Sequence, residues 1–90
     1  MYISLAKGDE SLNTVSEAQM LRYFGERLQK KMDYANTSQA ELAEELGVSQ
    51  ASISRYLNGV QMPPLTVFIN MVYFFDCDPS ELLDFYTRVV

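Results

Sequence analysis

Apolar residues recur at helical spacing along most of this chain, and short polar segments separate the runs. The first run has apolar residues three or four positions apart, as on one face of a helix: Leu21, Phe24, Leu28 and Met32. Thr14 and Glu17 precede this run with the hydroxyl and the carboxylate of a capping box. We therefore predict a helix that begins near Thr14 and ends before residues 36–38, whose polar side chains can cap the next element.

A second, shorter apolar run begins near Gln39. Leu42, Ala43 and Leu46 lie at i, i+1 and i+4, which places them on one face of a helix. Gly47 follows at once, where a chain that leaves a helix often needs a positive φ that glycine adopts without steric cost. The sequence therefore predicts a short helix that ends at Gly47.

A third helix is predicted directly after a tight turn, with Ser49 as its N-cap and Val48 as an apolar contact from the turn. The residues on one side of this helix are apolar: Ile53, Tyr56 and Leu57. The residues on another side are small or polar: Gln50, Ala51, Ser54 and Arg55. The small side chain of Ala43 lets the two short helices cross closely, as in a helix-turn-helix. An ordinary helical hairpin within a bundle is the alternative interpretation.

The fourth predicted helix, Leu65 to about Phe75, is apolar on nearly every side. It begins after Pro64, which suits the first position of a helix because no N–H is needed there. Four apolar residues lie on one stripe: Leu65, Phe68, Ile69 and Val72. Apolar residues also occupy the other sides: Val67, Met71 and Phe74. A helix of this kind must be covered on more than one face.

The fifth predicted helix begins near Asp78, which suits the N-cap, with Pro79 at the first helical position and Glu81 reaching back to the cap. Ninety residues are the length of one domain, which we expect to span residues 14–90. Residues 1–13 then form an N-terminal arm, either flexible or a short strand.

Several fixed spacings in this pattern resemble the Xre/Cro repressor-type helix-turn-helix family, which includes the phage repressor DNA-binding domains. The matching segments are residues 24–28, 38–43, 46–49 and 53–59. The resemblance spans roughly Glu17 to Phe85 and implies an all-α, five-helix bundle of the lambda-repressor-like DNA-binding type, with helices 2 and 3 as the helix-turn-helix. Lys31 departs from the family pattern, because many members have a buried leucine there. We therefore expect helix 1 to sit differently or to end earlier.

The charge of the chain is unusual for a DNA-binding protein. A net charge of −5 and a pI near 4.5 argue against binding by bulk electrostatics. The charge is uneven, however: residues 17–38 hold four cations and three acids, whereas residues 60–90 hold one cation and four acids. We therefore expect a few well-placed cations and backbone amides to bind DNA, with the acidic C-terminal half facing away from the phosphates.

Four residues of the third predicted helix suit base readout in the major groove: Gln50, Ala51, Ser54 and Arg55. Gln50 can bond adenine N6 and N7, Ala51 can pack against a thymine methyl, and Arg55 can form a fork to guanine O6 and N7. The alternatives are a phosphate contact or a solvated charge for Arg55, and a capping or solvated amide for Gln50.

Contacts with the DNA backbone are expected at helix starts, in the turn after the third helix and on the first helix: Ser38, Gln39, Ser49, Ser52, Asn58, Gly59, Lys30 and Lys31. Helix N-termini offer free N–H groups and a positive dipole end to phosphate oxygens. The resemblance implies a backbone contact by Gln39 and a close approach by the turn of Asn58 and Gly59. Solvated charges are an equally good interpretation of Lys30 and Lys31.

The C-terminal helices, about residues 65–90, are expected to serve dimerisation as well, because this region holds more apolar surface than one small domain requires. The expected interface residues are Phe74, Phe75, Phe85, Val89 and Val90. Burial of the same side chains within a monomer is the alternative.

The sequence therefore predicts a transcriptional regulator, a repressor, that reads a palindromic operator in double-stranded DNA as a homodimer. The alternative is a protein-interaction module, such as an antitoxin, an antirepressor or a modulator of another regulator, which the acidic charge favours. The chain has no histidine, no glycine-rich phosphate loop and no metal-ligand cluster, so we expect no enzyme activity, cofactor, metal or small-molecule ligand. The lone Cys77 and the lack of an apolar run that could span a bilayer lead us to expect a cytoplasmic protein without membrane contact.

Overall fold

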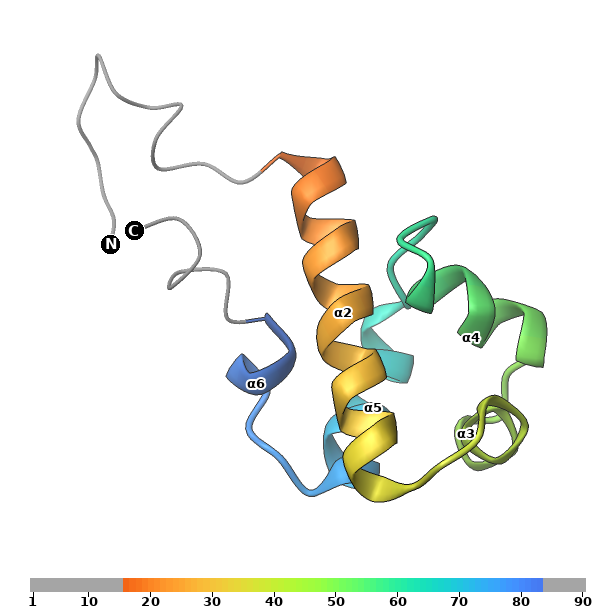
Figure 1. The fold of residues 1–90 in the computed structure, drawn as a ribbon. Coiled ribbons are helices and arrows are strands. Elements are labelled where there is room, and N and C mark those ends of the chain that lie inside the picture. Colours follow the sequence, from red (N-terminus) through yellow and green to blue (C-terminus); the bar gives the residue numbers. More distant parts are fainter. Residues whose placement is uncertain (1–15, 84–90) are drawn as a thin grey trace, which may run out of the picture.

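The computed structural model describes residues 16–83 and places five helices in that range (Figure 1). They are α2 (Glu17–Ala35), α3 (Gln39–Leu46), α4 (Gln50–Leu57), α5 (Leu65–Phe75) and α6 (Ser80–Leu83). Residues 16–83 include no strand, and none of their helices is long and apolar enough to cross a membrane. The predicted all-α fold is confirmed. The predictions for residues 1–13 and for Phe85, Val89 and Val90 concern positions outside the described range.

α2 begins at a capping box that lies two residues after the predicted one. The Ser16 hydroxyl accepts a hydrogen bond from the Gln19 N–H at 3.2 Å, and the Gln19 side chain accepts one from the Ser16 N–H at 3.0 Å. The prediction that Glu17 closes the box is therefore wrong, because Glu17 is the first residue of the helix. The sequence offers two hydroxyls, at positions 14 and 16, with a suitable partner three residues later, and glutamine serves this position as well as glutamate does.

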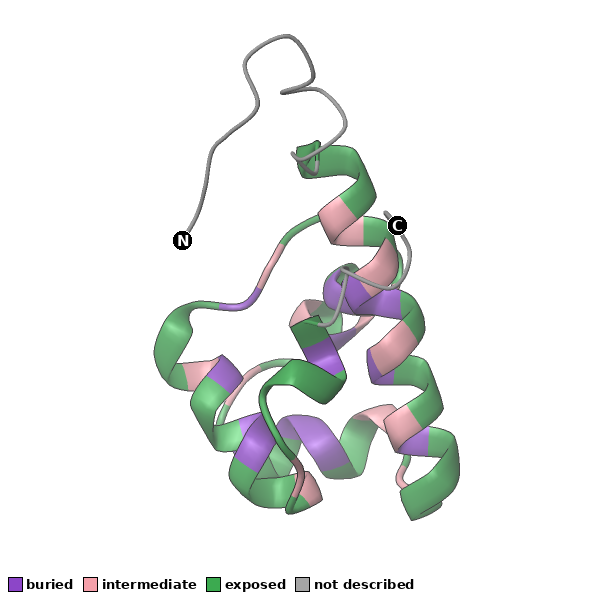
Figure 2. Cartoon of the chain, turned by 90° about the vertical axis from the view of Figure 1, so that its left-hand side faces the viewer, coloured by how far each residue is buried: buried purple, intermediate pink, exposed green. Residues whose placement is uncertain are grey.

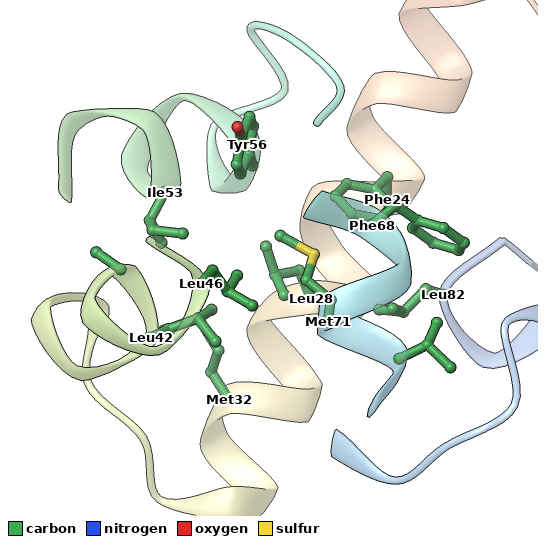
Figure 3. Close-up of a cluster of buried hydrophobic side chains, with 12 residues drawn as sticks. Phe24, Leu28, Met32, Leu42, Leu46, Ile53, Tyr56, Phe68, Met71 and Leu82 are labelled. Atoms are coloured by element: carbon green, nitrogen blue, oxygen red, sulfur yellow. The ribbon is translucent and has the colours of Figure 1, made fainter. Parts of the chain in front are cut away.

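α2 is the central helix of the bundle. In Figure 1, α6 lies on one side of α2 and the α3–α4 pair on the other, and the closest contacts are those of α4 with α2, of α3 with α4 and α5, and of α6 with α2. Figure 2 shows that burial is confined to the inward sides of the helices. The buried side chains, which converge between the helices in Figure 3, form one cluster: Phe24, Leu28, Met32, Leu42, Ala43, Leu46, Ile53, Tyr56, Phe68, Met71, Val72 and Leu82. All three apolar residues predicted to face inward on the second helix belong to this cluster.

Gly25 allows α4 to pack directly against α2. A Cβ at this position would lie 2.5 Å from the Leu57 carbonyl oxygen and 3.0 Å from the Tyr56 carbonyl oxygen. Both atoms belong to the backbone at the end of α4, so they cannot move aside as a flexible side chain could. The position therefore requires glycine, and it fixes how closely the two helices approach each other.

The core side of α5 is not the stripe that the sequence shows. Phe68 and Val72 of that stripe are buried, but Leu65 of the same stripe is 74% exposed and Ile69 is 36% exposed, while Met71 from another side is fully buried. A helix that is apolar on nearly every side can take more than one orientation without burying a polar group, so the sequence pattern sets its orientation weakly. Phe68 packs against Phe24 of α2, with the two ring centroids 6.2 Å apart.

The C-terminal end of α2 is tied to α6. α2 continues to Ala35, as its predicted end before residues 36–38 requires, so of the two alternatives drawn from Lys31 the earlier end is wrong. Lys31 is half-buried, and its ammonium forms an ion pair with the carboxylate of Glu81. α6 begins at Ser80, one residue after the predicted Pro79, and the predicted return of the Glu81 side chain to the cap is confirmed, because it accepts a hydrogen bond from the Asp78 N–H at 3.1 Å.

Candidate nucleic-acid interface

The turn between α3 and α4 has the geometry that the sequence predicts. Gly47 ends α3 with a φ of 69°, in the left-handed region, and no atom lies within 4 Å of the position of a Cβ. The Val48 N–H donates to the Ala43 carbonyl at 3.0 Å, and the Val48 side chain packs against the core. The turn is therefore fixed both by backbone hydrogen bonds and by apolar packing.

α3 begins with a complete capping box. The Ser38 hydroxyl accepts from the Glu41 N–H at 3.1 Å, and the Glu41 carboxylate accepts from the Ser38 N–H at 2.9 Å. Two hydrogen bonds with Ser38 hold the pKa of Glu41 below its ordinary value. The bond from the Ser38 backbone has the larger effect, and the bond with the Ser38 side chain has the smaller one. These bonds leave the N–H groups of half-buried Gln39 and exposed Ala40 available at the start of the helix.

α4 begins with the same kind of N-cap but without a carboxylate. The Ser49 hydroxyl accepts from the Ser52 N–H at 3.0 Å and donates to the Ser52 hydroxyl, also at 3.0 Å. No acidic residue lies in the first turn of α4, and its last turn holds Arg55. The positive dipole end of this helix is therefore not neutralised by a side chain of the same helix.

The four predicted readout residues share the side of α4 that faces away from the core. Gln50, Ala51 and Arg55 are exposed, whereas Ser54 is half-buried and its hydroxyl accepts from the Asn58 amide at 3.2 Å. The opposite side of the helix holds Ile53 and Tyr56, which are 0% and 2% exposed. The structure thus gathers the readout candidates on one outward face with one cation and no acid.

The loop after α4 adds a residue that the sequence reasoning missed. Gln61 accepts a hydrogen bond from Nε of Arg55 at 3.2 Å through its side-chain oxygen. The Val60 N–H donates to the Arg55 carbonyl at 2.9 Å, and Gly59 turns the chain with a φ of 71°. No periodic pattern predicts this contact, because Gln61 lies in a loop six residues beyond its partner.

The two lysines predicted to contact the DNA backbone lie on α2, and Lys31 faces α6 rather than α4. The hydrogen bond with Glu81 is the main cause that raises the pKa of Lys31, and the same bond lowers the pKa of Glu81. Lys30 is exposed and lines a shallow depression between α2 and α6 together with Arg27, Lys31 and Glu81. The structure therefore does not bring Lys31 to the outward face of α4.

The predicted dimer residues within the described range lie at the end of α5. Phe74 is 36% exposed, and its ring meets that of Phe75 edge-on at a centroid distance of 5.0 Å. Phe75 is half-buried and packs against the core. Leu65 and Tyr73, which are 74% and 76% exposed, extend the apolar surface of this helix.

Cys77 follows α5 and packs against the core as a half-buried side chain. Burial raises the pKa of its thiol. Cys77 therefore resembles a small apolar core side chain more than a reactive nucleophile. Residues 16–83 contain no group of three or more acidic, cysteine or histidine side chains that could hold a metal ion.

Comparison with known families agrees with this geometry. A family model described as helix-turn-helix matches residues 27–82, from the middle of α2 to α6. A search of curated proteins gave no match. The matched range contains α3, the turn, α4 and the helices that support them, so the chain is a DNA-binding helix-turn-helix protein of the Xre and lambda-repressor type, a family of transcriptional regulators.

Proposed function

We propose that the chain is a repressor that reads a palindromic operator as a homodimer, with α4 of each copy in the major groove. The observation that carries this proposal is the outward face of α4, where exposed Gln50, Ala51 and Arg55 lie together without an acidic residue. In an acidic chain with a net charge of −5, a face that carries one cation and no acid avoids local repulsion of the DNA phosphates.

The side chains on this face suit three different base contacts. Gln50 lies in the first turn of α4, where it can bond the N6 and N7 edge of adenine, and neighbouring Ala51 can pack against a thymine methyl. Arg55, about one turn later, can bond guanine O6 and N7 with two parallel N–H groups. Each good bidentate pair contributes roughly 1–3 kcal/mol of discrimination between bases.

Phosphate contacts would come mainly from the backbone. The N-termini of α3 and α4 favour anions, because N–H groups without a partner in the helix point out of them. At the start of α3 these are the N–H groups of Gln39 and Ala40. The loop at Asn58 and Gly59 lies beside the N-terminal half of α2, because a Cβ on Gly59 would lie 3.5 Å from the Leu21 carbonyl oxygen. Lys31 is paired with Glu81, and Lys30 lines the depression between α2 and α6, so neither lysine supports a phosphate contact beside α4.

A homodimer follows from the size of the reading surface and from the exposed apolar side chains of α5. One helix of eight residues reads only a short half-site, and two copies related by a twofold axis read an inverted repeat with centres about 34 Å apart. Leu65, Tyr73 and Phe74 leave apolar surface uncovered in the monomer, and a second copy would bury it.

A protein-interaction module is the second candidate function. The observation that favours it is the acidic outer surface of α3, where Glu41, Glu44 and Glu45 are all exposed. In that case the acidic surface would bind a basic partner protein, and the face of α4 would make no contact with DNA.

Selection from a random pool of duplex DNA, at low and at moderate salt, distinguishes the two candidates. We expect enrichment of an inverted repeat, and we expect Arg55→Ala to relax the preference at one base pair in each half-site by about 5- to 100-fold. Glu44→Ala is the matched control, because it removes an exposed charge from α3 and should leave the selected sequence unchanged. If no sequence is enriched at either salt, the DNA-reading proposal is wrong and the protein-interaction module takes its place.

The dimer is tested separately by sedimentation. Phe74→Glu should shift the protein toward monomer, whereas Tyr34→Glu, which alters a 92% exposed aromatic residue on α2, should not. An unchanged mass for Phe74→Glu would contradict an interface on this part of α5.

A further inference from the structure

We infer that Gln61 is a positioning residue for base readout: its side-chain oxygen holds Nε of Arg55, so that the two terminal nitrogens of the guanidinium face the DNA. The contact is 3.2 Å long and joins the last turn of α4 to the loop that leads into α5. This inference rests on the proposed function, because it specifies how one readout residue of that function is oriented.

The loop that carries Gln61 is held in place on both sides. Before it, the Gly59 N–H donates to the Tyr56 carbonyl at 3.3 Å and the Val60 N–H donates to the Arg55 carbonyl at 2.9 Å. After it, Pro63 is buried, and the carbonyl of Pro64, the residue before α5, accepts a hydrogen bond from the Phe68 N–H at 2.9 Å. Gln61 is therefore presented from a fixed backbone, and its hydrogen bond restrains Arg55 before DNA binds.

The use of Nε determines which atoms of Arg55 can read a base. A guanidinium has five N–H donors, and the bond to Gln61 occupies the one on Nε. The four donors on the two terminal nitrogens stay free, and these can meet guanine O6 and N7 end-on. The amide nitrogen of Gln61 is not used by this bond and can donate to a phosphate, which would link backbone position to base readout.

Two other roles for Gln61 lead to different results. If the contact only stabilised the fold, its removal would lower thermal stability and leave base preference intact. If it held Arg55 away from DNA, its removal would strengthen binding to every sequence. A positioning role predicts instead a loss of preference for guanine at one base pair, because an unrestrained Arg55 loses more conformational freedom on binding.

The test uses the full chain and the inverted repeat that it selects, together with duplexes in which the guanine read by Arg55 is replaced by each other base. We expect Gln61→Ala to lower the preference for guanine by about three- to ten-fold, with an unchanged melting temperature. Gln61→Glu keeps an acceptor for Nε, so it should retain the preference while its added charge weakens overall affinity. The double variant with Arg55→Ala should show no lower preference than Arg55→Ala alone.

Each result decides the inference. Unchanged preference in Gln61→Ala, or tighter binding to all duplexes, would overturn the positioning role while the proposed function stands. Unchanged preference in Arg55→Ala would overturn both the readout role of Arg55 and the role of Gln61. If the wild-type chain selects no sequence, the proposed function itself fails.

Discussion

α3 and α4 are a matched pair of helices with opposite surfaces. Each has eight residues, follows a serine N-cap and begins with glutamine and alanine. The next residue separates them: Glu41 completes the cap of α3, whereas Ser52 occupies the same position in α4. Farther along, Glu44 and Glu45 keep the outer side of α3 acidic, whereas Arg55 gives the outer side of α4 a positive charge.

The comparison shows how an acidic chain can present DNA with a suitable surface. In both helices a serine side chain bonds an N–H group of the first turn. In α3 a carboxylate also stabilises the N-terminus, whereas α4 has no carboxylate there and its outward face is free of acid. The difference lies in surface chemistry and not in backbone geometry.

The largest effect is expected when α4 is given an acid like those of α3. Ala51→Glu places a carboxylate on the outward face of α4, where we expect it to weaken DNA binding by roughly 3 kcal/mol, a loss of more than 100-fold. Ala40→Glu makes the same change at the equivalent position of α3, and its loss should be smaller and equal for all sequences. Fluorescence anisotropy with the selected duplex measures both. Equal losses of DNA affinity in the two variants would contradict the claim that α4, and not α3, reads the bases.

The packing of α4 against α2 gives the next largest effect, on stability. Gly25→Ala brings a methyl group against the backbone of α4, and we expect it to lower the free energy of unfolding by about 2–3 kcal/mol. Gly47→Ala at the end of α3 meets no atom within 4 Å and pays only for its positive φ, about 1 kcal/mol. Urea denaturation measures both variants. A smaller loss for Gly25→Ala than for Gly47→Ala would contradict this description of the α2–α4 contact.

Removal of each serine cap should produce a smaller difference. Ser49→Ala is expected to cost about 1 kcal/mol of stability, because α4 has no second group to replace the hydroxyl. Ser38→Ala should cost less, since the Glu41 carboxylate stays at the start of α3 and still bonds the backbone N–H of residue 38. Thermal melts followed by circular dichroism compare the two, and an equal or reversed order would contradict the contrast between the caps.

The smallest effect is a dependence of stability on pH that α3 should show and α4, which has no carboxylate, should not. The pKa of Glu41 is lowered in the folded protein, chiefly by the hydrogen bond from the Ser38 backbone, so its stabilising contribution is present above its ordinary value of 4.5 and is lost as the pH falls through the lowered value. Glu41→Gln should therefore lower stability near neutral pH and flatten the loss of stability on acidification below about pH 4.5. A pH series of urea denaturation curves tests this, and parallel curves for the two proteins would contradict it.

The sequence predicts best what local rules determine. The positive φ of Gly47 and the cap by Ser49 are each predicted from one turn of chain, and Ser38 is one of three polar residues predicted to cap α3, because capping and positive φ depend on neighbouring residues alone. The inward positions of α3 and α4 followed in the same way from helical spacing. The cap of α2 was misplaced by two residues because two hydroxyls satisfy the same rule.

Contacts between distant segments could not be predicted from periodicity. The orientation of α5 depends on which of its many apolar residues contact Phe24 and the rest of the core. The ion pair of Lys31 with Glu81 and the bond of Arg55 with Gln61 join side chains from different elements, and no spacing rule relates them. α2 is capped by Asn36 and α5 by Asp76, both with a positive φ. The sequence predicts a positive φ only at a glycine, because other residues adopt it at a steric cost.

The most direct test of the central claim, that the outward face of α4 reads DNA, is an NMR titration of the full chain with the selected duplex. We predict the largest amide shifts in the first turn of α4 and at Arg55, smaller shifts at Gln39 and Ala40, and none at Glu44 and Glu45. Shifts centred on the acidic side of α3, or confined to α5, would contradict the assignment of α4 as the reading helix.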